Sequence, residues 1–247
     1  MDVETHKRVG LARTLSKLGY CSRSQAAILI RGGRVALNGR ITRDPENPVR
    51  MRQDRIEVDG SPLNKIPTVY LVMNKPRGVV TTASDEKGRA TVYSLLESSL
   101  PWVGPVGRLD KASEGLLLLT NDSEWAARIT APSSHLKKKY HVQVDRVADA
   151  SLLARITRDG AVEGCLGEKL LAKDASILRH GDKNSWLEIT LDEGKNRQIR
   201  RLLEALGVQV LRLVRVSIGP LELGTLKKGS VRQLTAEEKK TIDRALA

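Results

Sequence analysis

A charged pair stands at the entrance to the most apolar stretch of this chain. Arg108 and Asp110 lie one residue apart in VGRLDKASEGLLLLTND, just before the four leucines of residues 116–119. Burying an ion is costly unless it is paired or used in chemistry. A lone Asp in a loop most often serves as a turn or cap residue. Here the basic neighbours and the apolar strand that follows favour a catalytic carboxylate held by rigid structure.

A second basic segment, EGKNRQIRRLLEALG (residues 193–207), has matching properties. Its isoleucine and leucines define the buried face of a helix, with Asn196 as the expected N-cap and Gly207 just past the end. Arg200 lies about 110° from that face and is predicted to reach inward to a buried carboxylate. Arg197 and Arg201 lie about 150° or more away, so we expect them to face solvent and to contact phosphates.

Residues 8–60, here called the N-terminal module, are predicted to form two short helices and a hairpin. Ser22 and Gln25 form a capping-box pattern, and Asn38-Gly39 is a strong hairpin-turn signal. Basic side chains decorate this module, namely Arg13, Lys17, Arg23, Arg31, Arg34, Arg40 and Arg43. The pattern favours a small RNA-binding module over a basic but inert domain.

Residues 61–67 read as a linker, because they contain two prolines and no periodicity. In residues 68–247 strands outnumber helices and do not alternate regularly with them. This predicts an α+β domain with a mostly antiparallel mixed sheet flanked by helices and loops. A Thr235 to Glu238 capping box is expected to open the last helix.

Composition restricts the classes of function. Lys and Arg number 42 against 29 acids, a net charge of +13, which predicts a polyanionic partner. Cys21 and Cys165 lie far apart and the four histidines are scattered, so we expect a reduced, cytosolic protein without a metal. The polar N-terminus and the lack of a long apolar run predict no signal peptide and no membrane span. We find neither the glycine-rich loop of a methyltransferase nor the clustered carboxylates of a metal-dependent nuclease.

Two family resemblances follow from these motifs. LSKLGYCSRSQAAILIRGGRVALNGR resembles the S4-type RNA-binding domain, over residues 8 to about 55. GRLDKASEGLLLLTND closely resembles the catalytic motif of pseudouridine synthases, and most of all the RsuA/RluB group that modifies ribosomal RNA. MNKPRGVVTT, KKYHVQV and EGKNRQIRRLLEALG match the same family, in the family's order.

The resemblance implies roles for particular residues. Asp110 is the catalytic carboxylate, acting as a nucleophile or as a base on the ribose, and Arg200 keeps it ionised. Tyr140 stacks on the uracil, although packing in the core is the alternative. Arg108 helps hold the target nucleotide out of its stack, as the chemistry requires. Lys75 is either structural or in contact with a phosphate.

The resemblance also implies a substrate and a setting. The expected partner is ribosomal RNA or a pre-ribosomal particle, with no cofactor, no metal and no membrane, and the chain is expected to be a cytoplasmic monomer. WVGPVGRLD and VLRLVRVSIGPL resemble the large-subunit (23S) enzymes more than the small-subunit (16S) one. The alternative is a non-catalytic ribosome assembly factor that binds the same RNA.

Overall fold

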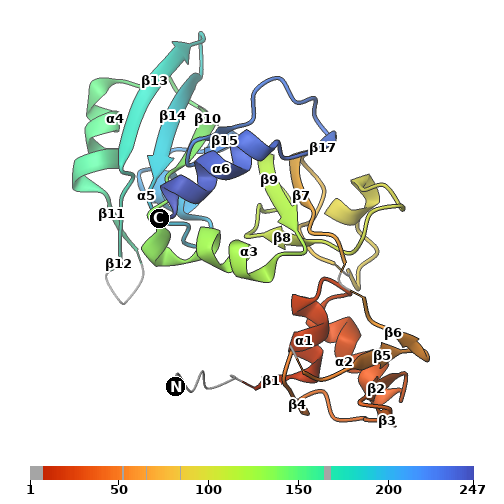
Figure 1. Ribbon diagram of the computed structural model, residues 1–247. Helices are drawn as coiled ribbons and strands as arrows, with labels where there is room; N and C mark the ends of the chain where they lie inside the picture. The colour runs from red at the N-terminus through yellow and green to blue at the C-terminus, as the bar shows by residue number, and fades with distance from the viewer. Residues whose placement is uncertain (1–7, 52, 65, 84, 164–167) are drawn as a thin grey trace. The chain divides into compact units, whose positions relative to one another are not determined.

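Figure 1 shows the computed structural model of the chain, which describes residues 8–51, 53–64, 66–83, 85–163 and 168–247. The chain divides into two compact units. The first unit combines the N-terminal part of the chain, up to Tyr70, with Glu97–Gly104 and Leu119–Ala127. The second unit contains Leu71–Leu96, Pro105–Leu118 and Arg128–Ala247.

The N-terminal module contains two helices and two small sheets. The helices are α1 (Leu11–Lys17) and α2 (Arg23–Arg31). Strands β1 (Val9–Gly10) and β4 (Pro48–Val49) pair with each other. The second sheet has the order β3 (Arg40–Ile41), β2 (Val35–Leu37), β5 (Ile56–Val58) and β6 (Ser61–Pro62).

Local sequence signals account for this arrangement. Ser22 and Gln25 form the predicted capping box at the start of α2. Asn38 and Gly39 have φ values of 51° and 79°, as a tight hairpin turn between β2 and β3 requires. A second such turn at Asp59-Gly60 returns the chain, so that β6 pairs with β5. The first two residues of the predicted linker therefore belong to this sheet.

A nine-stranded sheet is the main element of the second unit. Its order is β13 (Asp174–His180), β14 (Ser185–Leu191), β10 (Lys138–Val144), β15 (Val210–Ile218), β9 (Glu114–Thr120), β7 (Tyr70–Lys75) and β17 (Val231–Gln233). Strand β16 (Leu221–Glu222) pairs with β15, and β8 (Gly104–Val106) pairs with β9. Strands β10, β14, β13 and β15 pair antiparallel, whereas β15 and β9 run parallel.

Helices and a small hairpin complete the described part of the chain. The helices are α3 (Ser123–Thr130), α4 (Ala150–Ala154), α5 (Gln198–Ala205) and α6 (Ala236–Ala245). A π-helical turn at Arg155–Asp159 continues α4, and 3₁₀ turns lie at Val92–Leu95 and Pro132–Ser134. Strands β11 (Ala161–Glu163) and β12 (Glu168–Leu170) pair with each other. None of the described helices combines the length and apolar character that a membrane span needs.

Alternation along the strands separates a buried face of the sheet from a more exposed one. On β10, Tyr140, Val142 and Val144 are buried, whereas the residues between them are only partly covered. Helix α5 contacts the neighbouring strand β15 and contributes the buried Ile199 and Leu202. Because strand side chains alternate with period two, every second residue of β10 and β15 faces the same side as Tyr140.

The parallel pairing of β9 and β15 depends on a glycine. Gly115 lies opposite Arg215 and has a φ of 102°, in the range that side chains rarely adopt. A Cβ atom at this position would lie 2.2 Å from the carbonyl oxygen of Arg215. The backbones of β9 and β15 can therefore approach this closely only with glycine at position 115.

The structure confirms the predicted α+β class and the mostly antiparallel sheet. The predicted N-cap of α5 is wrong: the N-cap is Arg197, in the left-handed region with a φ of 50°, and no side chain caps it. Gln198 organises this turn instead, since its Oε1 accepts from the backbone N–H of Lys195 at 3.2 Å. Gly207 does follow the helix end, as predicted.

Candidate active site

Asp110 lies in the loop that joins β8 to β9, and its side chain is about 28% exposed. The loop contains a tight turn, in which the N–H of Ser113 donates to the carbonyl oxygen of Asp110 at 3.0 Å. Gly107, with a φ of 75°, lies just after β8. The carboxylate is thus presented beside the buried strand β9, as the sequence predicts.

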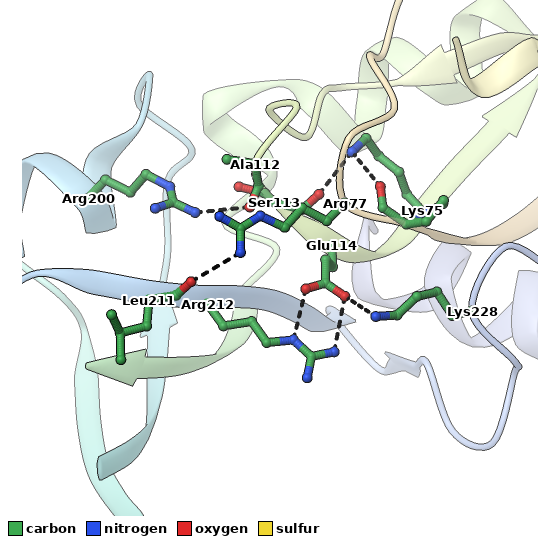
Figure 2. Close-up of polar contacts among 10 residues, drawn as sticks. Lys75, Arg77, Ala112, Ser113, Glu114, Arg200, Leu211, Arg212 and Lys228 are labelled. Carbon is green, nitrogen blue, oxygen red and sulfur yellow. Dashed lines mark hydrogen bonds and ion pairs between the residues drawn. The ribbon is translucent and has the colours of Figure 1, made fainter. Parts of the chain in front are cut away.

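The segment that follows β7 holds this loop through its backbone. Lys75 Nζ donates to the carbonyl oxygens of Asp110 at 3.1 Å and of Ser113 at 2.8 Å. The N–H of Gly78 donates to the carbonyl oxygen of Lys111 at 2.8 Å, and Thr81 Oγ1 donates to that of Leu109 at 2.7 Å. Figure 2 shows Lys75 directed at the loop. Segment 75–81 therefore supports the Asp110 loop along its length.

Lys75 itself is fully buried. Burial lowers the pKa of its ammonium to about 8, against the opposing attraction of Asp110 and Glu114. An ammonium with three carbonyl partners and no exposed surface does not contact RNA. Of the two roles considered for Lys75, phosphate contact is therefore wrong for this conformation, and the structural role agrees with the geometry.

The ion pair of Asp110 is made by Arg197, at 3.7 Å between Nη1 and Oδ2. The helical wheel predicted that Arg200 would fill this place and that Arg197 would face away. That prediction is wrong, because Arg197 precedes the helix in a left-handed conformation and does not follow the helical periodicity. Arg200 instead donates to the carbonyl oxygens of Ala112 at 3.1 Å and of Val210 at 3.4 Å (Figure 2).

A cavity of about 520 Å³ brings most of the predicted residues together. Its lining includes Arg108, Asp110, Tyr140 and Arg197. Tyr140 is 8% exposed and Arg108 is exposed, so an aromatic ring and a solvent-exposed cation border the same space as the carboxylate. Arg200 lines a neighbouring cavity of about 430 Å³, which it shares with Arg197.

Three basic residues that we did not predict also line the first cavity, namely Lys138, Lys195 and Arg215. Arg215 is 6% exposed and its Nε donates to the carbonyl oxygen of Leu116 at 2.8 Å. One of its terminal nitrogens is buried and lacks a hydrogen-bond partner among the described residues. Burial, followed by the nearby Arg215, lowers the pKa of Lys138. Strand alternation from Tyr140 back to Lys138 is the signal that could have revealed that residue.

A buried carboxylate anchors the start of β9. Glu114, 3% exposed, accepts from Arg212 at 2.8 and 3.0 Å and lies 2.5 Å from Lys228 Nζ (Figure 2). Burial alone would raise the pKa of Glu114, but the hydrogen bonds from Arg212 and Lys228 hold it below its ordinary value. This ionised cluster fixes the strand that carries the Asp110 loop.

The basic residues predicted for the N-terminal module lie mostly at its surface. Arg13, Arg23, Arg31, Arg34, Arg40 and Arg43 are exposed, and Lys17 is partly buried. Arg34 forms a two-bond ion pair with Asp59, at 2.8 and 2.6 Å. In the second unit, Arg201 is partly buried and donates to the carbonyl oxygen of Asn196 at 3.3 Å. Most of the predicted arginines of the module are thus available to a ligand.

The described residues give little support for a metal site or for a reactive cysteine. No group of three or more His, Cys, Asp or Glu side chains in that part of the chain is placed to hold a metal ion. Cys21 is buried and unpaired, and burial raises the pKa of its thiol to about 11. Cys165 lies outside the described residues.

The fold, and a carboxylate at the wall of a basic cavity, agree with the family matches of the sequence. The chain belongs to the RNA pseudouridylate synthase family, whose model matches residues 69–205, and an S4 domain model matches residues 9–56. It is therefore an isomerase that acts on RNA.

Individual relatives match along almost the whole chain. Ribosomal large subunit pseudouridine synthase B of Bacillus subtilis is 36% identical over 238 residues, 96% of each chain. An uncharacterized RNA pseudouridine synthase of Rickettsia typhi is 39% identical over 233 residues, 94% of each chain. A crystal structure of a pseudouridylate synthase superposes with a TM-score of 0.66 and 31% identity, covering 95% of this chain and 99% of the other.

Proposed function

We propose that Asp110 is the catalytic carboxylate of an enzyme that converts a specific uridine of ribosomal RNA, in the large subunit, to pseudouridine. One observation carries this proposal: Asp110 borders a cavity that also contains Tyr140, Arg108 and Arg197. The large-subunit preference rests on the B. subtilis relative, whose name states that substrate.

The chemistry needs little more than this cavity supplies. The bond between carbon-1 of the ribose and N1 of uracil breaks, the base turns, and carbon-1 bonds to carbon-5. The proton on carbon-5 is lost and N1 gains one, so no second substrate is consumed. A glycosidase needs two carboxylates because its leaving group departs and water replaces it. Here the base stays in the pocket, so one carboxylate suffices as nucleophile or as base.

Neighbouring residues complete the proposed site. Tyr140 offers an aromatic face on which uracil can stack, and Arg108 is exposed at the cavity, where it can hold the nucleotide out of its stack. The Arg197 guanidinium forms an ion pair with the Asp110 carboxylate, at 3.7 Å between Nη1 and Oδ2. Arg200 supports the loop through the Ala112 carbonyl oxygen rather than through the carboxylate.

We propose a division of the chain into an RNA-binding domain near residues 8–60, a short linker, and a catalytic domain over residues 68–247. Pairing of β6 with β5 supports an end of the first domain after Pro62. The exposed arginines of the N-terminal module support its contact with RNA phosphates.

The decisive experiment is Asp110→Asn, which keeps the size of the side chain and removes the anion. Tritium release from carbon-5-labelled uridine in rRNA should fall below detection, while thermal melting and RNA affinity stay near wild type. Asp182→Asn, in the exposed turn between β13 and β14, is the matched control and should keep full activity.

Mapping pseudouridine in rRNA from cells with and without this protein identifies the modified position. Near-normal turnover by folded Asp110→Asn would reject the catalytic assignment. The wild-type protein could fail to form pseudouridine in the assay, and cells with and without it could show the same pseudouridines in rRNA. That result would favour a non-catalytic assembly factor.

A further inference from the structure

Three guanidinium groups gather beside the Asp110 loop, on elements far apart in the sequence. Arg77 lies in the segment after β7, Arg197 precedes α5, and Arg200 lies within that helix. Arg77 Nη1 approaches the carbonyl oxygen of Leu211 at 3.5 Å, and Arg200 Nη1 donates to that of Val210 at 3.4 Å. Val210 and Leu211 are consecutive residues of β15, and the charge of Arg77 acts on Arg200, so the two guanidinium groups lie near each other (Figure 2).

Their position is fixed by the structure that holds the loop. Gly78, next to Arg77, donates its N–H to the carbonyl oxygen of Lys111, and Arg200 donates to that of Ala112. Both arginines are therefore connected to residues immediately after Asp110. The neighbouring cavity of about 430 Å³ is lined by Arg197 and Arg200 and also by the acidic residues Asp145 and Glu204, whereas Arg77 lies outside its lining.

Bringing the guanidinium groups of Arg77, Arg197 and Arg200 close together costs free energy in the protein without RNA, because like charges repel. Burial first, and then the charges of Arg197 and Arg77, lower the pKa of Arg200, while Asp110 opposes them. The carbonyl contact of Arg77 is long and its side chain is exposed, so it contributes little to stability. The Nε of Arg200 is buried without a hydrogen-bond partner among the described residues. A bound anion would relieve the repulsion among the three guanidinium groups and give the exposed Arg77 a closer partner.

We propose that Arg77 and Arg200, together with Arg197, bind one phosphodiester group of the RNA strand that carries the target uridine. Guanidinium groups bind phosphate oxygens in a two-bond geometry, which suits a site made of several arginines. Arg197 lines both this cavity and the Asp110 cavity, so a phosphate bound beside it would set the register of the strand next to the flipped nucleotide. This inference rests on the proposed function, because it concerns the same RNA strand.

The test is Arg77→Gln, because Arg77 is exposed and its loss does not disturb the core. RNA binding is measured in the Asp110→Asn background by filter binding of an rRNA transcript across a series of salt concentrations. The salt slope of log Kd should fall by about one and Kd should rise about three- to tenfold near physiological salt. Arg77→Lys should keep the slope, and Arg155→Gln, on the exposed π-helical turn, is the control and should change neither quantity.

Kinetics of Arg77→Gln with Asp110 intact separate binding from positioning of the loop. The inference expects a raised KM with kcat close to wild type. An unchanged salt slope and Kd would overturn it, and so would a fall in kcat at unchanged KM. If the wild-type protein forms no pseudouridine but Arg77→Gln still lowers the slope, the proposed function fails while the phosphate site stands.

Discussion

Asp110 is positioned mainly through the backbone of its loop. Lys75, Gly78 and Thr81 bond to consecutive parts of that loop, and Arg200 bonds to the carbonyl oxygen of Ala112. The direct contact of its carboxylate, with Arg197, is longer and partly exposed to solvent. Partly exposed ion pairs contribute little stability because water and salt screen them. We infer that Arg197 contacts the Asp110 carboxylate directly, whereas Arg200 holds the backbone of its loop.

The buried ammonium of Lys75 predicts an unusual pH dependence of stability. Its pKa is about 8 in the folded protein and 10.5 in the unfolded chain. Between these values the unfolded chain binds more protons, so this group makes stability rise with pH. Compared with Lys75→Met, the wild-type protein should gain about 2 kcal/mol between pH 7 and pH 10.

Thermal melting of both proteins between pH 7 and pH 10 measures the difference in stability between wild type and Lys75→Met. The other titrating groups are common to both proteins, so their effects cancel in this difference. The Met variant should be less stable throughout, because the carbonyl oxygens of Asp110 and Ser113 lose their donor. A constant difference between the two melting curves from pH 7 to pH 10 would show that the ammonium is not perturbed.

At the scale of elements, the sequence predicted well those caps and turns that depend on residues close together in the chain. The Ser22–Gln25 and Thr235–Glu238 capping boxes and the Asn38-Gly39 turn all form as expected, because each depends on residues within a few positions. Arg197 was misplaced because its left-handed conformation comes from the turn before α5, which a helical wheel does not describe.

Other features depend on tertiary structure and leave no local signal. The burial of Lys75 follows from the approach of the Asp110 loop, 35 and 38 residues further along the chain. Strand β13 was missed because it is mostly exposed and its sequence, DASILRH, has no apolar run. Asp110 could be singled out because its motif is highly specific, and its catalytic role stays a prediction, whereas Arg215 reaches the cavity only through strand pairing.

The N-terminal module is expected to supply a separable electrostatic part of RNA binding. Replacing four of its exposed arginines by Gln, at positions 13, 23, 31 and 40, should lower the salt slope of rRNA binding by up to about four. Arg34 is retained because it pairs with Asp59. Thermal melting should change little, since the four side chains are exposed.

The matched control changes the net charge equally at exposed sites of the second unit, in Arg155, Lys183, Lys227 and Lys240. Filter binding over a salt series compares the two quadruple variants. An equal loss of slope in both would mean that RNA binding responds to the net charge of the chain and not to this module.

At the scale of the whole molecule, the lysines and arginines that give the net charge of +13 serve different purposes. Some cations are engaged within the protein, as Arg212 and Lys228 are at Glu114, and Lys75 is buried under the loop. Other arginines are exposed, among them Arg77 and, in the N-terminal module, Arg13, Arg23, Arg31 and Arg40, and we expect these to meet a polyanion. We therefore expect association with RNA to be fast and steeply dependent on salt.

The whole protein is also expected to work without added small molecules. Neither the sequence nor the described side chains provide a cluster of metal ligands, and the isomerisation consumes no second substrate. Tritium release from a short unstructured RNA should therefore persist in EDTA at close to the untreated rate. Loss of activity in EDTA that one particular divalent ion restores would contradict this expectation, whereas a requirement seen only with folded rRNA reflects the RNA.

The close approach of β9 and β15 has a consequence for the order in which the protein forms. Arg215 donates to the carbonyl oxygen of Leu116 across 99 residues of chain, and the Gly115 contact joins the same two strands. Contacts between residues so distant form late, because closing a long loop costs chain entropy. During synthesis β15 emerges long after β9, so the pocket beside Asp110 is completed only once residues 210–218 have been made. A growing or prematurely ended chain can therefore fold its N-terminal module and hold RNA while it is still unable to modify it.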